Sequence, residues 1–248
     1  FSKLSWYSVS ESKTTYNDAL ISIPDLSALT NLSTLDIRYN DNLECVEGYP
    51  EHINELTNSY PNYPYPIICE NTYQVGDFVE GGIVFYIDET GEHGLVAALE
   101  DITEGSNMGL YGTPEGFEWG CYGTSVATAY QNLAIGTGLE NTEAIVSQNC
   151  QTVNGGITAA QGTLNYATEG FTDWFLPSRY ELEEMYNSIG GGGAEGNIGG
   201  FETNDYAIYW SSSESNNNYA GVVSVSNGGT PTNRTKYDSL RVRAVRAF

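Results

Sequence analysis

The chain of 248 residues carries 32 Asp and Glu against 9 Lys and Arg, which gives a formal net charge of −23. Between Arg38 and Arg179 there is no Lys or Arg at all, while 20 carboxylates fall in that stretch. A surface of this sign repels phosphate and sulfate polymers, so nucleic acid, anionic membranes and sulfated glycosaminoglycans are poor candidates as partners. No apolar run approaches the length of a membrane span, and membrane insertion is not expected. The start at Phe1 is consistent with a processed or truncated product.

The first seventy residues contain one clear leucine-rich repeat pattern. Its apolar positions and its asparagine have the repeat spacing: Leu29, Leu32, Leu35, Ile37, Asn40 and Leu43. One copy cannot bury its own apolar face, so the segment is predicted to be the last turn of a leucine-rich array, with residues 1–28 as a candidate degenerate turn before it. We therefore expect a leucine-rich-repeat-like segment and cap over residues 1–71, followed by a main domain over residues 72–248.

The four cysteines fall two by two on either side of this boundary. Four cysteines permit three pairings, and pairing within each segment closes the shortest loops. The sequence thus predicts disulfides Cys45–Cys69 and Cys121–Cys150. There is no Cys-x-x-Cys pair, and His52 and His93 are the only histidines, so a zinc site is not expected.

The first half of the main domain begins with a predicted hairpin. Gly82–Asp88 and Gly94–Leu99 are apolar and β-branched, with turn residues between them. Segments 125–135, 139–148 and 156–168 have roughly helical spacing and are predicted to be short helices.

A further helix is predicted directly after Pro177. Ser178 and Glu181 have the spacing of a capping box, and Leu182, Met185, Tyr186 and Ile189 then form an apolar stripe. The run Gly190–Gly200 lacks the lysine and the strand-to-helix setting of a phosphate loop, so it is predicted to be a flexible surface loop.

The C-terminal region alternates short apolar strands with polar loops. Ile208–Ser211, Ala220–Ser226 and Leu240–Ala247 are the predicted strands, and the loops between them, 214–219 and 227–238, are dense in Ser, Asn, Thr and Tyr. Tyr supplies rigid amphipathic area and Asn supplies hydrogen bonds, as in antibody loops, although an ordinary turn has much the same composition. The predicted ligand-contacting residues are Tyr206, Asn216, Asn217, Asn218, Tyr219, Asn233 and Tyr237.

The last strand concentrates three arginines in a chain with few cations. Arg241, Arg243 and Arg246 are interpreted as internal counter-ions for carboxylates such as Asp173, Glu181 or Glu184, with an anion-binding site as the alternative. Trp174 and Trp210 are interpreted as core anchors.

Five blocks in order and spacing resemble the C-terminal domain of the bacterial collagen-like adhesin family. They are residues 75–77 (VGD), 81–88 (GGIVFYID), 173–179 (DWFLPSR), 209–214 (YWSSSE) and 240–248 (LRVRAVRAF). The resemblance implies an α+β, C-type-lectin-like domain, with short helices and twisted antiparallel strands, related in fold to the formylglycine-generating enzyme. That enzyme family depends on C-terminal cysteines that bind copper, and this chain has none after Cys150. Two histidines also leave little scope for a nucleophile and base pair, so no enzymatic activity is expected.

Calcium is the ion that the carboxylates would best suit. Glu100, Asp101 and Glu104 place hard oxygen ligands in a short stretch, and a second acidic group, Asp88, Glu89 and Glu92, lies in the predicted hairpin turn. Neither stretch has the pattern of an EF-hand, and a calcium site is the minority hypothesis beside plain solubility.

Together these features favour an extracellular, secreted or surface-attached adhesin that recognises a glycan or protein on another surface. The alternative is a structural subunit of an extracellular filament or a viral tail fibre, in which the same loops meet other copies of the chain.

Overall fold

The computed structural model describes residues 73–107 and 116–248, together with the backbone of five short strands before them. The chain forms two compact units, Phe1–Thr72 and Tyr73–Phe248. The boundary predicted from the sequence lies at residue 72.

The first unit contains short strands that pair in parallel. They are β1 (Glu11–Lys13), β2 (Ser22–Ile23), β3 (Thr34–Asp36), β4 (Cys45–Val46) and β5 (Glu55–Thr57). Glu11 is the register partner of Thr34, which is in turn the partner of Glu55, so equivalent positions recur about every 22 residues, within the range of leucine-rich repeats. The side chains of this unit, including the predicted Cys45–Cys69 disulfide, lie outside the described residues, and the leucine-rich packing stays a prediction.

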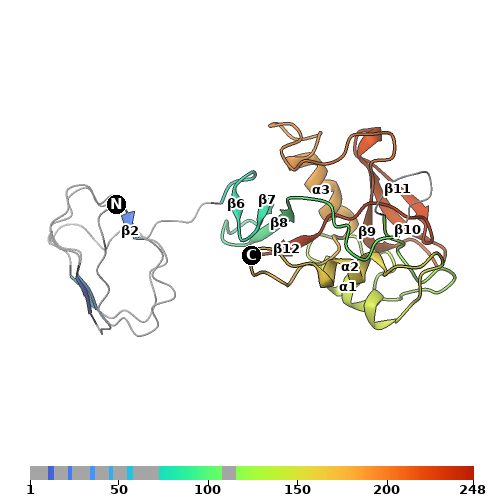
Figure 1. Ribbon diagram of the computed structural model, residues 1–248. Coiled ribbons are helices and arrows are strands. Elements are labelled where there is room, and N and C mark those ends of the chain that lie inside the picture. The colour runs from blue at the N-terminus through green and yellow to red at the C-terminus, as the bar shows by residue number, and fades with distance from the viewer. Residues whose placement is uncertain are drawn as a thin grey trace. The chain divides into compact units, whose positions relative to one another are not determined.

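The second unit mixes helices with two antiparallel sheets and is of the α+β class (Figure 1). One sheet has the order β12-β8-β7-β6 and the other the order β11-β10-β9. The helices are α1 (Gly138–Ser147), α2 (Ala159–Asn165) and α3 (Arg179–Ile189), with a short 3₁₀ helix, η2 (Val225–Asn227). The strands are β6 (Phe78–Val79), β7 (Gly82–Ile87), β8 (Gly94–Ala98), β9 (Ile208–Glu214), β10 (Tyr219–Ser224), β11 (Thr230–Thr235) and β12 (Val245–Ala247).

The predicted hairpin is formed by β7 and β8. Its turn is closed by Asp88, whose side chain accepts hydrogen bonds from the backbone N–H groups of Thr90 (2.9 Å) and Gly91 (3.1 Å). The Thr90 hydroxyl, which donates to the same oxygen, lowers the pKa of Asp88. Asp88 therefore serves the turn, as Asp commonly does.

Helix α3 follows its sequence signature closely. The Ser178 hydroxyl accepts from the Glu181 N–H, and the Glu181 carboxylate accepts from the Ser178 N–H, which completes the predicted capping box. The predicted apolar stripe is buried, and the helix ends at Ile189 before the glycines. The prediction of a surface loop is wrong at the end of the glycine run, because Gly199 is buried and its carbonyl accepts a hydrogen bond from Arg243.

No helix forms over residues 125–135, so that prediction is wrong. The Ala129 N–H bonds to the Val126 carbonyl and closes a single turn. The turn ends at Gln131, whose backbone is left-handed (φ 52°) and whose N–H bonds to the carbonyl of Glu214 in β9. Tertiary hydrogen bonds to a distant strand thus override the local helical spacing. The other two predicted helices are present as α1 and a shortened α2.

Two predictions about the C-terminal strands also need correction. The predicted strand Leu240–Ala247 is regular only as β12, because Leu240 pairs with Phe117 and Arg241 with Tyr209 in isolated bridges. The predicted loop 227–238 contains strand β11, an edge strand whose exposed polar residues lack the alternation that would reveal it.

The core of the second unit is built around large aromatic side chains. Trp119, Trp174 and Trp210 are fully buried, as predicted for the last two. The Trp119 indole N–H donates to the Ser211 carbonyl (2.9 Å), and the Trp210 indole N–H donates to the Phe117 carbonyl (2.7 Å). These bonds satisfy the buried indoles and fix β9 against the segment that precedes Cys121.

Candidate binding surface

The predicted calcium ligand Asp101 lies in an ion-pair cluster with two arginines. Its Oδ1 accepts from Arg243 Nε (2.8 Å), and its Oδ2 accepts from an Arg241 guanidinium N–H (3.1 Å) and from the Tyr209 hydroxyl (2.9 Å). Arg243 is almost fully buried and also donates to the carbonyls of Ala98 and Gly199. The arginines are therefore internal counter-ions, with Asp101 as the carboxylate that the sequence did not indicate.

This environment does not fit a calcium site around Asp101. Both carboxylate oxygens are occupied by positively charged or neutral donors, and a cation would have to displace two guanidinium groups. Glu100 and Glu104 are exposed beside it. Within residues 73–107 and 116–248, no group of three or more His, Cys, Asp or Glu side chains is placed to hold a metal ion. The calcium hypothesis stays a prediction.

Arg246 has the role that the sequence analysis gave it. It donates to Asp173, and it also pairs with Glu80. Its guanidinium lies over the Phe171 ring, 4.2 Å from the centroid. These contacts join the C-terminal strand β12 to the turn after β6 and to the segment before α3.

The seven predicted contact residues do not form one site. Asn216, Asn217 and Asn218 form the β9–β10 hairpin turn, Tyr219 begins β10, and Tyr237 follows β11 at the same end of the sheet. Tyr206 lies beyond the other end of β9, a strand of seven residues that spans about 20 Å. Asn233 lies within β11. The structure thus groups five of the residues and separates two.

Two tyrosines that the sequence analysis missed join this group. The Gly123 N–H donates to the Asn217 carbonyl (2.9 Å), which places Tyr122 beside the hairpin, and the Tyr122 ring packs edge-to-face on Tyr237 at 4.8 Å. Tyr130 lies alongside the end of β9, where it bridges to Glu214. No local signal marks either tyrosine, because both reach the hairpin only through contacts distant in sequence.

We call this end of the sheet the tyrosine surface. Its side chains are Tyr122, Tyr130, Asn216, Asn217, Tyr219 and Tyr237. Tyr122, Tyr130 and Tyr219 are 47%, 48% and 44% exposed, respectively, so each presents a large part of its surface to solvent.

The asparagines of the hairpin have different roles. The Asn216 side-chain oxygen accepts from the backbone N–H groups of Asn218 (2.8 Å) and Tyr219 (3.0 Å), so it shapes the turn. The exposed Asn217 side chain has no hydrogen-bond partner among the described residues, and its amide is available to a ligand.

A buried ion pair lies beneath the tyrosine surface. Lys236 and Glu214 are in contact, and both side chains are 0% exposed. The Lys236 ammonium also donates to the Thr124 carbonyl (2.9 Å) and lies 4.4 Å from the centroid of the Trp119 ring. Burial lowers the pKa of Lys236, while Glu214 opposes that shift. The Glu214 carboxylate accepts in addition from the Val126 N–H (3.0 Å).

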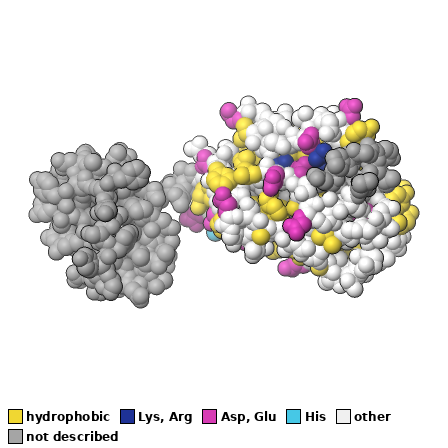
Figure 2. All heavy atoms as spheres, in the orientation of Figure 1, with side chains coloured by type: hydrophobic (Ala, Val, Ile, Leu, Met, Phe, Trp, Pro, Cys, Tyr) yellow, Lys and Arg dark blue, Asp and Glu magenta, His cyan; other side chains and the backbone are white. Residues whose placement is uncertain are grey.

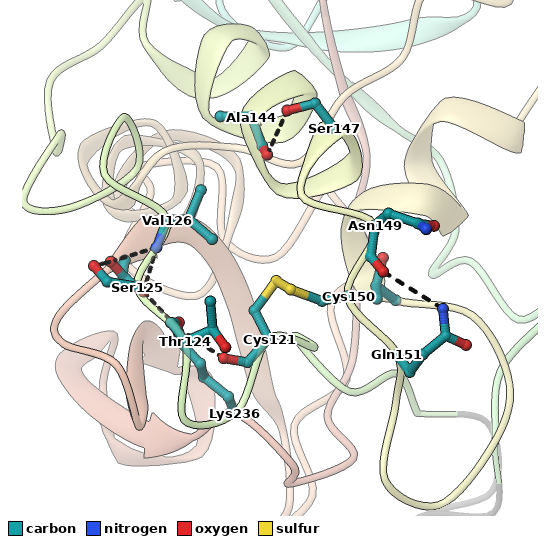
Figure 3. The surroundings of a disulfide bond; sticks show 12 residues. Cys121, Thr124, Ser125, Val126, Ala144, Ser147, Asn149, Cys150, Gln151 and Lys236 are labelled. Carbon is teal, nitrogen blue, oxygen red and sulfur yellow. Dashed lines mark hydrogen bonds and ion pairs between the residues drawn. A yellow bond between two sulfur atoms is a disulfide. The ribbon is translucent and has the colours of Figure 1, made fainter.

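The ion pair connects the three segments that carry the tyrosines. Glu214 ends β9, Lys236 follows β11, and Thr124 and Val126 belong to the segment between Tyr122 and Tyr130. Figure 3 shows Lys236 reaching toward this segment below the Cys121–Cys150 disulfide, the second predicted pair. The disulfide ties the same segment to the chain just after α1. The backbone under the exposed rings is thus fixed by one covalent link and one buried charge pair.

The rest of the surface is acidic. On the face drawn in Figure 2, Asp and Glu side chains are scattered over the second unit and few Lys or Arg side chains are visible. In the described part of the chain, no helix is long and apolar enough to pass through a lipid bilayer.

Comparison with known proteins gives no family for this chain. No family model matches the sequence, and no curated protein matches it. Among solved structures, a fimbrial protein from Bacteroides ovatus ATCC 8483 is 17% identical, with a TM-score of 0.40. The match covers 77% of this chain and 49% of that one, so the chain spans about half the length of that structure.

Proposed function

We propose that the chain is an extracellular, non-enzymatic binding protein whose lectin-like second unit recognises a glycan or a protein on another surface through the tyrosine surface. One observation carries the proposal: three exposed tyrosines stand on a backbone that a fully buried ion pair holds in place. A rigid aromatic platform loses little conformational entropy on binding, which is what recognition by tyrosine requires.

The chemistry of the surface supports a ligand with both apolar faces and hydroxyl or amide groups. Tyrosine rings stack on the apolar face of a sugar or an aromatic side chain, and their hydroxyls form hydrogen bonds at the rim. The Asn217 amide adds a donor and an acceptor. No positive side chain belongs to the surface, so a neutral ligand suits it better than a sulfated one.

An extracellular location is part of the same proposal. A structural disulfide persists in oxidising compartments and is rare in the cytosol of most organisms. The strongly acidic composition keeps an exported protein soluble.

The test is a glycan array probed with the full chain and with two single variants. Tyr219→Ala removes a ring from the tyrosine surface, and Tyr206→Ala removes an equally exposed ring from the far end of β9. We expect Tyr219→Ala to weaken binding at least about tenfold, as expected for a central aromatic contact, and Tyr206→Ala to leave binding unchanged.

The opposite pattern, with binding lost only in Tyr206→Ala, would move the site to the other end of the sheet. A parallel array with chelator shows whether calcium contributes. A blank array from folded protein would favour the structural-subunit alternative.

A further inference from the structure

Among the residues that the structure describes, strand β11 is an edge strand with one neighbouring strand. In the described part of the chain its sheet has the order β11-β10-β9, so β11 pairs with β10 alone, and its residues are exposed except for the half-buried Thr235. Open edges are sites where another strand can add, and many proteins block them. The backbone groups on this edge therefore decide whether β11 can accept a partner.

The register shows which backbone groups of β11 point outward. In an antiparallel pair, alternate residues exchange hydrogen bonds with the neighbouring strand, and the residues between them direct their N–H and C=O away from it. The Lys236 N–H bonds to the Asn218 carbonyl (3.0 Å), whereas the Tyr219 carbonyl accepts from Ser215 on the β9 side. Thr235, the partner of Tyr219, therefore points outward, as do Asn233 and Pro231.

These three outward residues offer an unusual set of donors and acceptors. Asn233 presents both an N–H and a C=O. Thr235 presents only its N–H, because its carbonyl already accepts from the Asp238 N–H (2.8 Å). Pro231 presents only its C=O, because proline has no N–H. The remaining outward groups are the N–H and C=O of Asn233, the N–H of Thr235 and the C=O of Pro231. None of them forms a hydrogen bond with a described residue.

We propose that β11 pairs antiparallel with β11 of a second copy, across a two-fold axis at Asn233. In this register Asn233 exchanges both of its hydrogen bonds with the partner's Asn233. The Thr235 N–H donates to the carbonyl of the partner's Pro231, and the reciprocal bond forms as well. The missing N–H of Pro231 would face the carbonyl of the partner's Thr235, which is already satisfied within its own chain. Every outward group on the edge is then paired.

Proline also selects this register. Pro231 on an open edge ordinarily protects against uncontrolled strand addition. Shifting the two copies by one pair of residues would place its missing N–H opposite a carbonyl that needs a donor, such as that of Asn233. The edge therefore favours one symmetric partner and opposes others, as a closed two-fold interface requires.

The charges along β11 are compatible with this pairing. Arg234 is exposed and is the one Lys or Arg among the described residues that forms no ion pair. Two-fold symmetry at Asn233 sets Arg234 opposite the partner's Thr232, so the two arginines do not face each other. The overall charge of the copies is strongly negative, so we expect the dimer to become tighter as salt screens their repulsion.

The dimer would give the molecule two binding ends. Because paired strands run antiparallel, the β9–β10 hairpins of the two copies point in opposite directions, and so do their tyrosine surfaces. Two ligands on separate surfaces could then be bridged. The pairing itself does not depend on what the tyrosine surface binds, so the test below is independent of the proposed function.

The test is sedimentation velocity of the full chain over a range of concentrations. Asn233→Pro removes the central N–H and leaves the bonds to β10 intact, and Asn233→Ala is the matched control that keeps the N–H. We expect a concentration-dependent dimer for the wild type and for Asn233→Ala, and a dissociation constant at least about tenfold higher for Asn233→Pro.

Cross-linking gives a second measurement that does not depend on the proline variant folding. Residues in a hydrogen-bonded antiparallel pair have Cα atoms about 5.5 Å apart, which suits a disulfide. Oxidised Asn233→Cys should give a covalent dimer, whereas Asn217→Cys in the hairpin turn should not. A wild type that stays monomeric while Asn233→Cys fails to cross-link would overturn the proposal. So would a dimer of equal strength in folded Asn233→Pro and Asn233→Ala.

Discussion

Breaking the buried ion pair of Lys236 and Glu214 should lower the free energy of unfolding by several kcal/mol. Glu214→Gln keeps the size of the side chain and an acceptor for the Val126 N–H, but it removes the charge that faces Lys236. In the variant, the buried Lys236 side chain can adopt either of two protonation states. It can keep its charge with only carbonyl partners, or it can lose its proton.

Both protonation states lower the free energy of unfolding by a similar amount. Leaving one member of a buried ion pair without its partner costs about 3–5 kcal/mol in measured systems. Releasing the proton of a lysine with the ordinary pKa of 10.5 at pH 7 costs at most about 4.8 kcal/mol, since one pKa unit is about 1.36 kcal/mol. Because burial already lowers the pKa of Lys236, the actual cost lies below that limit, and we expect a loss of about 3–4 kcal/mol.

The assay is urea unfolding followed by tryptophan fluorescence, since Lys236 lies over the Trp119 ring. The matched control is Glu183→Gln, which breaks the partly exposed pair of Arg179 and Glu183 (3.0 Å) within α3 and should cost less than about 1 kcal/mol. Equal losses in the two variants would refute the reasoning, because the pair at Glu214 would then behave as a surface salt bridge.

Three further predictions concern stability. Arg243→Lys should lower the free energy of unfolding in urea by about 3 kcal/mol, because an ammonium cannot reproduce the guanidinium hydrogen bonds to Asp101 and two carbonyls. A loss near zero would mean that these hydrogen bonds do not contribute to stability. Replacing Cys121 and Cys150 by Ser should lower the free energy of unfolding, measured by thermal unfolding, by about 3.5 kcal/mol, the value expected for a disulfide that closes a 29-residue separation. A much smaller loss would show that removing the disulfide does not raise the conformational entropy of the unfolded chain. Burial, with Asp101 next in effect, raises the pKa of the Tyr209 hydroxyl above its ordinary value of 10.0. The stabilisation of the fold by Tyr209 is therefore fully present below about pH 10. It is lost as the pH rises toward the folded-state pKa of Tyr209, by about 1.4 kcal/mol per pH unit. The stability difference between wild type and Tyr209→Phe should shrink over that range, and a difference that grows with pH would contradict the direction of the shift.

Local signals in the sequence predicted local structure well. The capping box of Ser178 and Glu181 and the turn at Asp88 depend on residues within a few positions of one another. The helix expected over residues 125–135 failed because the bonds that decide its conformation come from Glu214, far along the chain. Strand β11 was missed because both faces of an exposed edge strand are polar and show no alternation.

The candidate site shows the same limit. Composition draws attention to the hairpin asparagines, but loop composition does not reveal which end of a sheet a residue occupies. Tyr206 and Asn216 flank the same strand and therefore lie at its opposite ends. The residues next to Asp101 in the sequence are acidic and suggest calcium, whereas its neighbours in space are Arg241 and Arg243.

The internal use of cations bears on the kind of ligand that the tyrosine surface can bind. Of the six Lys and Arg side chains in the described residues, all but Arg234 are paired with carboxylates. The remaining surface carboxylates are uncompensated, so an approaching anion meets a repulsive field that salt screens over about 10 Å at 0.1 M. A neutral glycan should therefore bind with the same affinity at low and high salt, and an acidic glycan should bind more tightly as salt is added. Binding that weakens with salt would require attraction between opposite charges, which this surface does not offer.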